Sequence, residues 1–206
     1  MVAIKKFFLF LIILSLFFIA KIEVRSEIIY VDDDGAGCFT TISEALSYAS
    51  PGDIIYVYEG VYRESVIINK SLKIIGENAT IECLNSQHGF IINSNCTIEG
   101  FEIRNSSNGY FGIYLNNVEN CEIKNCNISS SYGGIYIYRG ENIVLSENTF
   151  YNNSYGISGV GFTSSIIKEN FFVGNSRGIY LGADTSYNLI FYNTFLSNLQ
   201  DAYDES

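Results

Sequence analysis

The feature that most constrains the fold is a repeat of 22 residues in the second half of the chain. The quartet Gly-Ile-Tyr-Leu begins at Gly112, and related quartets begin at Gly134, Gly156 and Gly178. When the segments are aligned at this spacing, one column of apolar residues holds Ile113, Ile135, Ile157 and Ile179. A fixed period of this length means that the chain builds the same structural unit repeatedly.

Two more apolar columns follow the same spacing and continue into the last unit, which carries one extra residue. They hold Ile123, Leu145, Ile167 and Ile190, and then Ile128, Phe150, Phe172 and Phe195. Helical repeats need about 33 residues or more, and leucine-rich repeats need several leucines, which most units here lack. The units are rich in Ile, Tyr, Asn, Ser and Gly, which is typical of short strands and turns. We therefore predict an all-β, single-stranded parallel β-helix with coils of about 22 residues, in which equivalent residues stack.

One column of asparagines and one column of glycines mark the corners of the predicted coil. One of them holds Asn148, Asn170 and Asn193. A tight corner leaves backbone N–H and C=O groups without partners, and a stacked amide can satisfy both kinds, so we interpret these asparagines as structural. We interpret the four glycines that open the units as turn positions, where a positive φ has no steric cost.

The segment before the coils has the pattern of a capping helix. In the stretch TTISEALSYAS, apolar residues recur at helical spacing at Ile42, Ala45, Leu46 and Ala49. Thr41 and Glu44 stand in the register of a capping box, and Pro51 ends the pattern. We expect an N-terminal cap with an amphipathic helix in residues 27–52 and the coils in residues 53–206.

Residues 1–26 have the pattern of a secretory signal peptide. Lys5 and Lys6 precede 14 uncharged residues at positions 7–20, and a short segment ending at Ser26 supplies the cleavage context. We predict cleavage after Ser26, which would leave the chain secreted or at the cell surface without membrane contact. The alternative is an uncleaved anchor, although the run is shorter than the about 20 residues of a membrane span.

The chain that remains after cleavage is strongly acidic. Four basic residues and Glu23 leave with the signal, so 8 basic and 21 acidic residues remain, a net charge of −13. Such a surface repels nucleic acid and anionic lipid, so we expect no nucleic-acid partner.

The five cysteines form no CxxC pair, and the chain has a single histidine, so a zinc site would need an all-thiolate cluster. Cys96 and Cys121 share a column, two residues before Ile98 and Ile123, and should both point inward. A disulfide between them is marginal because parallel neighbours hold their Cβ atoms farther apart than about 4 Å. Export permits disulfides, but we favour buried, inert thiols and expect no metal and no cofactor.

Residues 38–78, from CFTTISEAL to KIIGEN, closely resemble the opening of pectin-lyase-like right-handed parallel β-helix proteins. The repeats from Gly89 onward are similar to those of carbohydrate-binding and sugar-hydrolase proteins, of NosD proteins and of microbial cell-surface proteins. The resemblance covers nearly all of the chain after residue 26 and implies a right-handed β-helix. It implies no single activity, because the scaffold hosts lyases, esterases, hydrolases and non-enzymes.

The catalytic sets that this resemblance implies are missing from the sequence. Pectate lyases use calcium-binding aspartates with an arginine base, polygalacturonases use clustered aspartates with a Gly-His-Gly stretch, and methylesterases use two aspartates with glutamines and an arginine. In the repeat region Asp184 is the only aspartate before the tail, and His88 has no matching partner and is interpreted as a turn residue. Arg104, Arg139 and Arg177 fall in different columns. We therefore assign no catalytic residue.

Two pairs of glutamates are stacked one unit apart, Glu119 with Glu141 and Glu147 with Glu169. Paired carboxylates can perform acid–base catalysis or bind calcium, and they can equally be solvated surface residues. At about 5 Å in water their repulsion is only on the order of 1 kcal/mol, which does not require a ligand between them.

A column of tyrosines is the candidate binding site. Tyr114, Tyr136 and Tyr180 each follow an inward isoleucine, so strand alternation points them outward in one column, with Ser158 as a gap. Exposed rings at this spacing could bind the flat faces of sugars. The alternative is that the stacked rings only cover and stiffen a strand face.

The sequence as a whole predicts an exported β-helix that binds polysaccharide or a surface protein without catalysis. The alternative is a lyase, hydrolase or esterase that acts on acidic polysaccharide, which would require a catalytic cluster that the columns do not show. A third alternative is a structural piece whose last edge pairs with another chain, unless Asp201, Asp204 and Glu205 discourage that pairing by charge.

Overall fold

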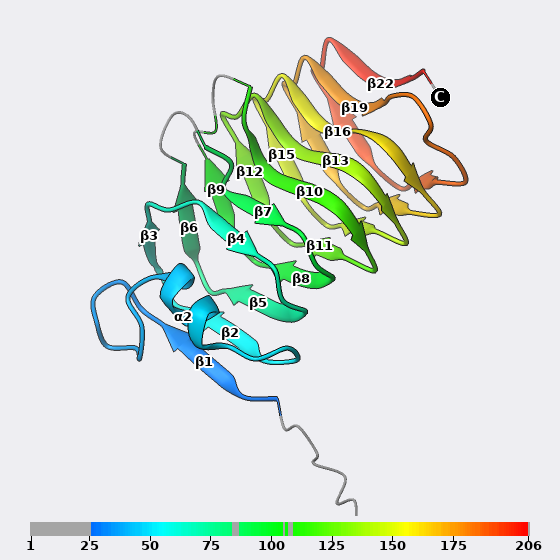
Figure 1. Cartoon of the computed structure of the whole chain (residues 1–206). Coiled ribbons are helices and arrows are strands. Elements are labelled where there is room, and N and C mark those ends of the chain that lie inside the picture. The colour runs from blue at the N-terminus through cyan, green and yellow to red at the C-terminus, as the bar shows by residue number, and fades with distance from the viewer. Residues whose placement is uncertain (1–25, 84–86, 105, 107–108, 206) are drawn as a thin grey trace, which may run out of the picture.

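Three parallel sheets wound into one solenoid form the described part of the protein (Figure 1). The computed structural model describes residues 26–83, 87–104, 106 and 109–205. Within these residues the sheets hold eight, seven and seven strands, and consecutive coils pair in parallel. The predicted all-β parallel β-helix is confirmed. The predicted signal peptide lies outside the described residues apart from Ser26, and in the described ranges no helix is long and apolar enough to cross a membrane.

We name the three sheets A, B and C in chain order. Each of the seven described coils contributes one strand to every sheet, and β1 precedes them as the eighth strand of sheet A. Sheet A consists of β1 (Ile28–Val31), β2 (Ile54–Val57), β5 (Leu72–Gly76), β8 (Cys96–Glu99), β11 (Glu122–Lys124), β14 (Val144–Ser146), β17 (Ile166–Lys168) and β20 (Leu189–Phe191). Sheet B consists of β3 (Gly60–Tyr62), β6 (Ala79–Glu82), β9 (Glu102–Arg104), β12 (Asn127–Ser129), β15 (Thr149–Tyr151), β18 (Phe171–Val173) and β21 (Thr194–Leu196). Sheet C consists of β4 (Val66–Ile68), β7 (Phe90–Ile92), β10 (Phe111–Glu119), β13 (Gly133–Glu141), β16 (Tyr155–Thr163), β19 (Arg177–Leu181) and β22 (Gln200–Asp204).

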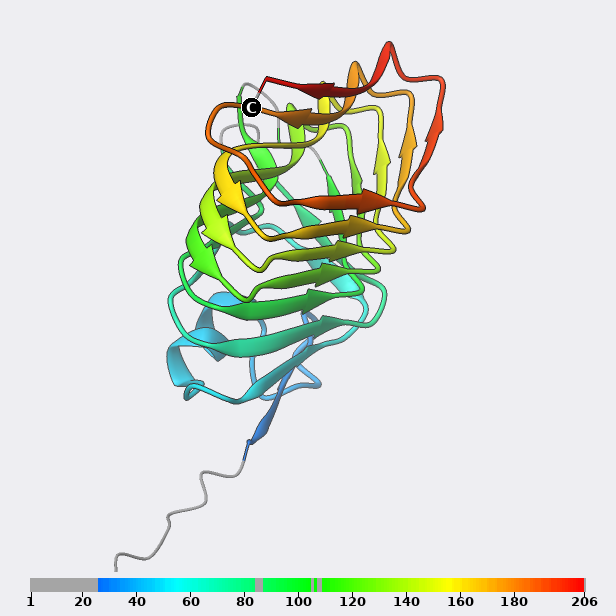
Figure 2. The same cartoon turned by 90° about the vertical axis from the view of Figure 1, so that its right-hand side faces the viewer.

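The strand register places the predicted apolar columns in the core. Ile113, Ile135, Ile157 and Ile179 pair in succession along sheet C, and all four are fully buried. In sheet B the rings of Phe150 and Phe172 stack with centroids 4.9 Å apart and planes 13° apart. Equivalent residues therefore lie directly over one another as the coils follow a common axis (Figure 2).

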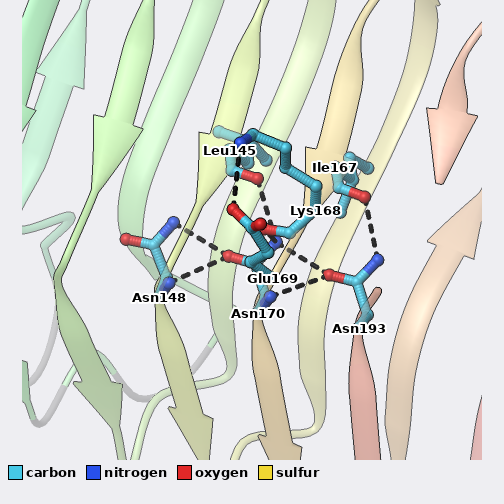
Figure 3. Close-up of polar contacts among 7 residues, drawn as sticks. All are labelled: Leu145, Asn148, Ile167, Lys168, Glu169, Asn170 and Asn193. Carbon is cyan, nitrogen blue, oxygen red and sulfur yellow. Dashed lines mark hydrogen bonds and ion pairs between the residues drawn. The ribbon is translucent and has the colours of Figure 1, made fainter. Parts of the chain in front are cut away.

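The asparagines of the predicted column satisfy the backbone at the corner between sheets A and B. Asn170 Oδ1 accepts from the backbone N–H of Asn148 at 3.0 Å, and its Nδ2 donates to the Leu145 carbonyl at 2.9 Å (Figure 3). The same amide donates to Oδ1 of Asn193 at 3.0 Å, and Asn193 donates to the Ile167 carbonyl at 2.8 Å. The structural interpretation of these residues is confirmed.

A second asparagine ladder occupies the corner between sheets B and C. The alignment of the repeats did not identify it. Asn175 Oδ1 accepts from the backbone N–H of Asn153 at 2.9 Å, and its Nδ2 donates to the Phe150 carbonyl and to Asn198 Oδ1, both at 3.0 Å. The corner between sheets C and A has fewer hydrogen bonds of this kind. There, Asn188 Oδ1 accepts from the N–H of Ser165 at 2.9 Å. In the coils that carry these asparagines, polar side chains thus satisfy backbone groups at all three corners.

The positive-φ explanation for the four repeat glycines is wrong, because none of them has a positive φ. Glycine is required at these positions because core atoms lie too close to the backbone to leave room for a side chain. A Cβ on Gly156 would lie 2.5 Å from the carbonyl oxygen of Gly178 and 2.5 Å from Cδ1 of Phe172. A Cβ on Gly134 would meet Phe150 in the same way. The phenylalanine column therefore fills the space that a side chain would need.

The predicted capping helix is α2 (Ile42–Tyr48), which packs against β1, β2 and β4 at the N-terminal end of the solenoid (Figure 1). Half of the predicted capping box forms, since Thr41 Oγ1 accepts from the Glu44 N–H at 3.2 Å. The first two helical N–H groups donate instead to the carboxylate of Glu64, at 2.8 and 3.0 Å. Lys70 Nζ donates to carbonyl groups at the other end of α2, so the first full coil anchors both ends of the helix.

All five cysteines are free thiols, and four of them are buried. The expectation of buried thiols is wrong for Cys38, which is exposed in the loop before α2. A hydrogen bond to Cys121 and burial hold the pKa of Cys96 well above its usual value. Burial raises the pKa of the Cys126 thiol to about 12. The thiols of Cys96 and Cys126 therefore remain protonated at neutral pH, whereas the hydrogen bond with Cys96 lowers the pKa of Cys121.

Thiol reactivity tests this arrangement. The native protein is expected to react rapidly with one equivalent of Ellman's reagent, at Cys38, because only a thiolate that the reagent can reach attacks it. In guanidinium chloride all five cysteines should react. Cys38→Ser should abolish the rapid phase, and a rapid phase that persists in this variant would show that a buried thiol is accessible.

Removal of one ladder amide should destabilise the fold. Asn170→Ala leaves the Asn148 N–H and the Leu145 carbonyl without partners, and we expect a loss of about 2–4 kcal/mol in the free energy of unfolding. The control is Asn127→Ala at an exposed position of β12, which should change stability by no more than about 0.5 kcal/mol. Guanidinium unfolding followed by circular dichroism measures both, and equal values would contradict the structural role of the ladder.

Candidate functional site

The three predicted tyrosines lie in one column on sheet C. Tyr114 pairs with Tyr136, Tyr136 with Ser158, Ser158 with Tyr180, and Tyr180 with Tyr203 of the last strand. We call these five residues the tyrosine column. Its existence follows from the register, whereas its role as a glycan platform stays a prediction.

The rings of the tyrosine column are turned toward one another. Tyr114 and Tyr136 stack with centroids 5.6 Å apart and planes 15° apart, so each ring face covers its neighbour and the edges are turned outward. Both side chains are half-buried, and burial raises the pKa of each hydroxyl. Ser158 is only 4% exposed, and its hydroxyl has no hydrogen-bond partner. This geometry leaves little ring face for a sugar.

His88 lies at one end of the tyrosine column and is more than the isolated turn residue that the sequence suggested. Its ring centroid is 4.9 Å from that of Tyr114, and its Nδ1 accepts from the Phe111 N–H at 3.0 Å. Burial lowers the pKa of His88, because the neutral ring loses less hydration than the charged ring would.

Aromatic contacts continue past the Ser158 gap through a neighbouring set of rings. The ring centroids of Tyr136 and Phe111 are 4.8 Å apart, and those of Phe111 and Tyr132 are 5.6 Å apart. The ring centroids of Tyr132 and Tyr155 are 5.7 Å apart, and those of Tyr155 and Tyr180, which belongs to the tyrosine column, are 5.9 Å apart. Together with His88, Tyr114 and Tyr203 these residues form an unbroken aromatic run along the solenoid.

A groove follows the corner between sheets B and C, beside this run. It is formed by the turns at 130–132, 152–155, 174–177 and 199–200, and we call it the corner groove. Its two adjoining cavities have volumes of about 620 and 480 Å³ and share Ser154 and Ser176. Tyr132 and Tyr155 line it together with serine hydroxyls, amides and one guanidinium group. No acidic side chain is among its described lining residues.

Arg177 supplies that guanidinium group and is held in place by its neighbours. Its Nε donates to Gln200 Oε1 at 3.2 Å, and its Nη1 donates to the Tyr155 hydroxyl at 3.2 Å. Its central carbon lies 5.5, 5.4 and 5.7 Å from the ring centroids of Tyr155, Tyr180 and Tyr203. Cation–π attraction from several rings favours the charged group in this position.

The glutamate pairs do not converge on a catalytic site. Glu119 lies opposite Glu141 at exposed positions that border a cavity of about 190 Å³. Glu147 and Glu169 occupy turn positions with a positive φ, and Glu169 pairs with Lys168 at 2.9 Å (Figure 3). Among the described residues no group of three or more His, Cys, Asp or Glu side chains could hold a metal ion.

The residues of the corner groove were not identified from the sequence. Tyr155 and Arg177 pair in adjacent strands, and Arg177 pairs with Gln200. These positions stand two residues before the inward isoleucine column, so they could have been aligned at the 22-residue spacing. The side chains differ from unit to unit, however, and a search for like residues does not find such a column.

The comparisons with known proteins agree with the fold. Residues 93–205, more than half of the chain, match the family model described as a right handed beta helix region. The chain therefore belongs to this family, and the right-handed form that the resemblance implied is confirmed.

Two individual proteins are similar to this chain. A cell surface glycoprotein of Methanothermus fervidus is 33% identical over 126 residues, which cover 59% of this chain and 20% of the relative. The chain thus spans about a fifth of the length of that relative. The solved structure of ORF18 of Geobacillus virus E2 has a TM-score of 0.45 and 13% identity, over 84% of this chain and 60% of the viral one.

The environment of His88 predicts a specific pH dependence of stability. Its pKa is lower in the folded protein than the about 6.5 of an unfolded chain, so its contribution to stability is present above pH 6.5 and is lost as the pH falls through the folded pKa. His88→Asn keeps an acceptor for the Phe111 N–H but does not titrate. Between about pH 7.5 and 5.5 the native protein should lose stability relative to this variant in urea unfolding, and parallel pH profiles would contradict the assignment.

Proposed function

We propose that this protein is a non-catalytic module of the cell surface or the extracellular space that binds polysaccharide in the corner groove. The observation that carries the proposal is the groove itself, which combines an aromatic wall with hydroxyl, amide and guanidinium groups. Concave sites of this composition suit sugars, whose rings have apolar faces and hydroxyl edges.

The course of the groove supports a polymeric ligand. Its lining comes from equivalent turns of successive coils, which are spaced about 4.8 Å apart in a parallel β-helix. The hydroxyls of Ser154 and Ser176 repeat at this spacing, and the other lining side chains, which differ between coils, can contact further units of the same chain. Binding energy then accumulates along the ligand without a deep pocket.

A surface location is supported by two independent observations. The relative from Methanothermus fervidus is named a cell surface glycoprotein, although this chain spans only a fifth of it. Residues 1–26 also have the pattern of a signal peptide, and the net charge of −13 that follows its removal suits a soluble exposed domain.

The absence of carboxylates from the described groove lining supports binding without hydrolysis. Glycosidases place two carboxyl groups beside the scissile bond, one as acid and one as base or nucleophile. The exposed Glu119 and Glu141 line a different cavity, at the C-terminal ends of strands β10 and β13, whereas the groove borders the opposite end of the sheet C strands. The enzyme alternative therefore requires groups that the groove does not contain.

Binding measurements on a glycan array test the proposal. Tyr132→Ala and Tyr155→Ala should each weaken binding about tenfold, about 1.4 kcal/mol, because a buried sugar face loses its aromatic partner. Tyr187→Ala, at a side chain that is 87% exposed outside the groove, is the matched control and should bind normally.

The same experiment separates the groove from the tyrosine column. Tyr114→Ala with Tyr136→Ala should leave binding nearly unchanged if the groove is the site, and should abolish it if the column is the platform. Normal binding by Tyr132→Ala and Tyr155→Ala would refute the groove as the binding site. Shortened glycans released from the array would show that the protein is an enzyme.

A further inference from the structure

We infer that Arg177 forms an anion subsite within the corner groove and that it selects glycans with isolated carboxylate or sulfate groups. This inference rests on the proposed function and adds the chemical class of its ligand.

The distribution of ion pairs singles out this side chain. Most basic residues of the described chain are paired with carboxylates, namely Arg63, Lys73, Arg104, Lys124 and Lys168. Lys70 donates to carbonyl groups of α2, and Arg139 lies over the Tyr138 ring outside the groove. Within the described residues, Arg177 is the basic side chain that lines the groove, and it forms no ion pair.

Arg177 keeps enough free donors for a bidentate contact with a carboxylate. A guanidinium group has five N–H donors, and Arg177 uses one on Nε for Gln200 and one on Nη1 for Tyr155. The other three lie on the two terminal nitrogens. This edge can donate two parallel hydrogen bonds to the oxygens of a carboxylate or a sulfate.

The surroundings of Arg177 strengthen such a contact. The side chain is half-buried among Tyr155, Tyr180 and Tyr203, which lowers the local dielectric constant around the charge. Gln200 and Tyr155 hold the group in one orientation before a ligand arrives, so less conformational entropy is lost on binding. No carboxylate in the described groove lining competes for it.

The net charge limits what kind of acidic ligand fits. A polyanion would be repelled by a chain whose net charge is −10, and −13 once the predicted signal peptide is removed, whereas a mostly neutral glycan with occasional acidic groups would not. A uronic acid and a sulfated sugar present the same bidentate oxygens to Arg177. The ligand class is therefore a sparsely acidic glycan, and the acidic group is the point that the groove recognises.

Matched triplets of oligosaccharides test this inference. Each triplet carries glucuronic acid, glucose or glucose 6-sulfate at one position of an otherwise neutral chain, and binding to the full chain is measured on an array. The acidic members should bind about tenfold or more tightly than the glucose member. The acidic member that binds more tightly then shows whether the subsite prefers a carboxylate or a sulfate group.

Three variants assign the preference to one side chain. Arg177→Gln should reduce the ratio between acidic and neutral members to about one, and Arg177→Lys, which keeps the charge without the fork, should retain only part of it. Arg139→Gln removes a comparable arginine over a tyrosine outside the groove and should keep the full ratio. Thermal melts by circular dichroism confirm that each variant is folded.

Nuclear magnetic resonance provides a second measurement on the same site. Titration with free glucuronate, with glucose as the control, should shift the side-chain N–H signals of Arg177. Equal binding of all triplet members, or a preference that persists in Arg177→Gln, would overturn this inference and leave the proposed function intact. Failure of every glycan to bind would overturn both.

Discussion

In-register parallel pairing between consecutive coils is the interaction on which every other feature of this protein depends. Each backbone hydrogen bond of the ladder places a residue directly over its equivalent one coil earlier, as in the isoleucine column of sheet C. A column therefore has a single environment along the solenoid. Apolar columns become a continuous core, and the phenylalanine column is so tightly stacked that the neighbouring position must be glycine.

The corners are the weak points of such a fold, because the chain leaves the ladder there. The protein satisfies its backbone groups at these points with stacked amides, most completely along Asn148, Asn170 and Asn193. Outside the second amide ladder, the side chains of the B–C corner are free to vary. This is where the rings of Tyr132 and Tyr155 and the guanidinium of Arg177 line a groove. The rigid ladder beneath holds the variable side chains above it in fixed positions, which is what a binding surface requires.

The electrostatic character of the molecule fits this arrangement. Most basic side chains of the described coils neutralise nearby carboxylates on the outer faces of sheets A and B. The groove is exempt from this pattern, since its described lining contains an arginine and no acid. Cation–π contacts with tyrosines take the place of an ion pair there. One side of the solenoid is thereby distinguished from the rest of an acidic surface.

The sequence by itself determined the fold class, the coil length, the core columns, the capping helix and the first asparagine ladder. It could do so because parallel register forces like residues to recur at one spacing, and a period is visible without coordinates. Tertiary structure alone decided why the repeat glycines are needed, that Cys38 is exposed, that His88 joins an aromatic run, and that Tyr132, Tyr155 and Arg177 share a groove. These features arise from contacts between different columns across a bent corner, such as Phe172 against Gly156 or Arg177 over Tyr180. Spacing along the chain carries no information about such contacts, because the path of the backbone around each corner decides which columns meet.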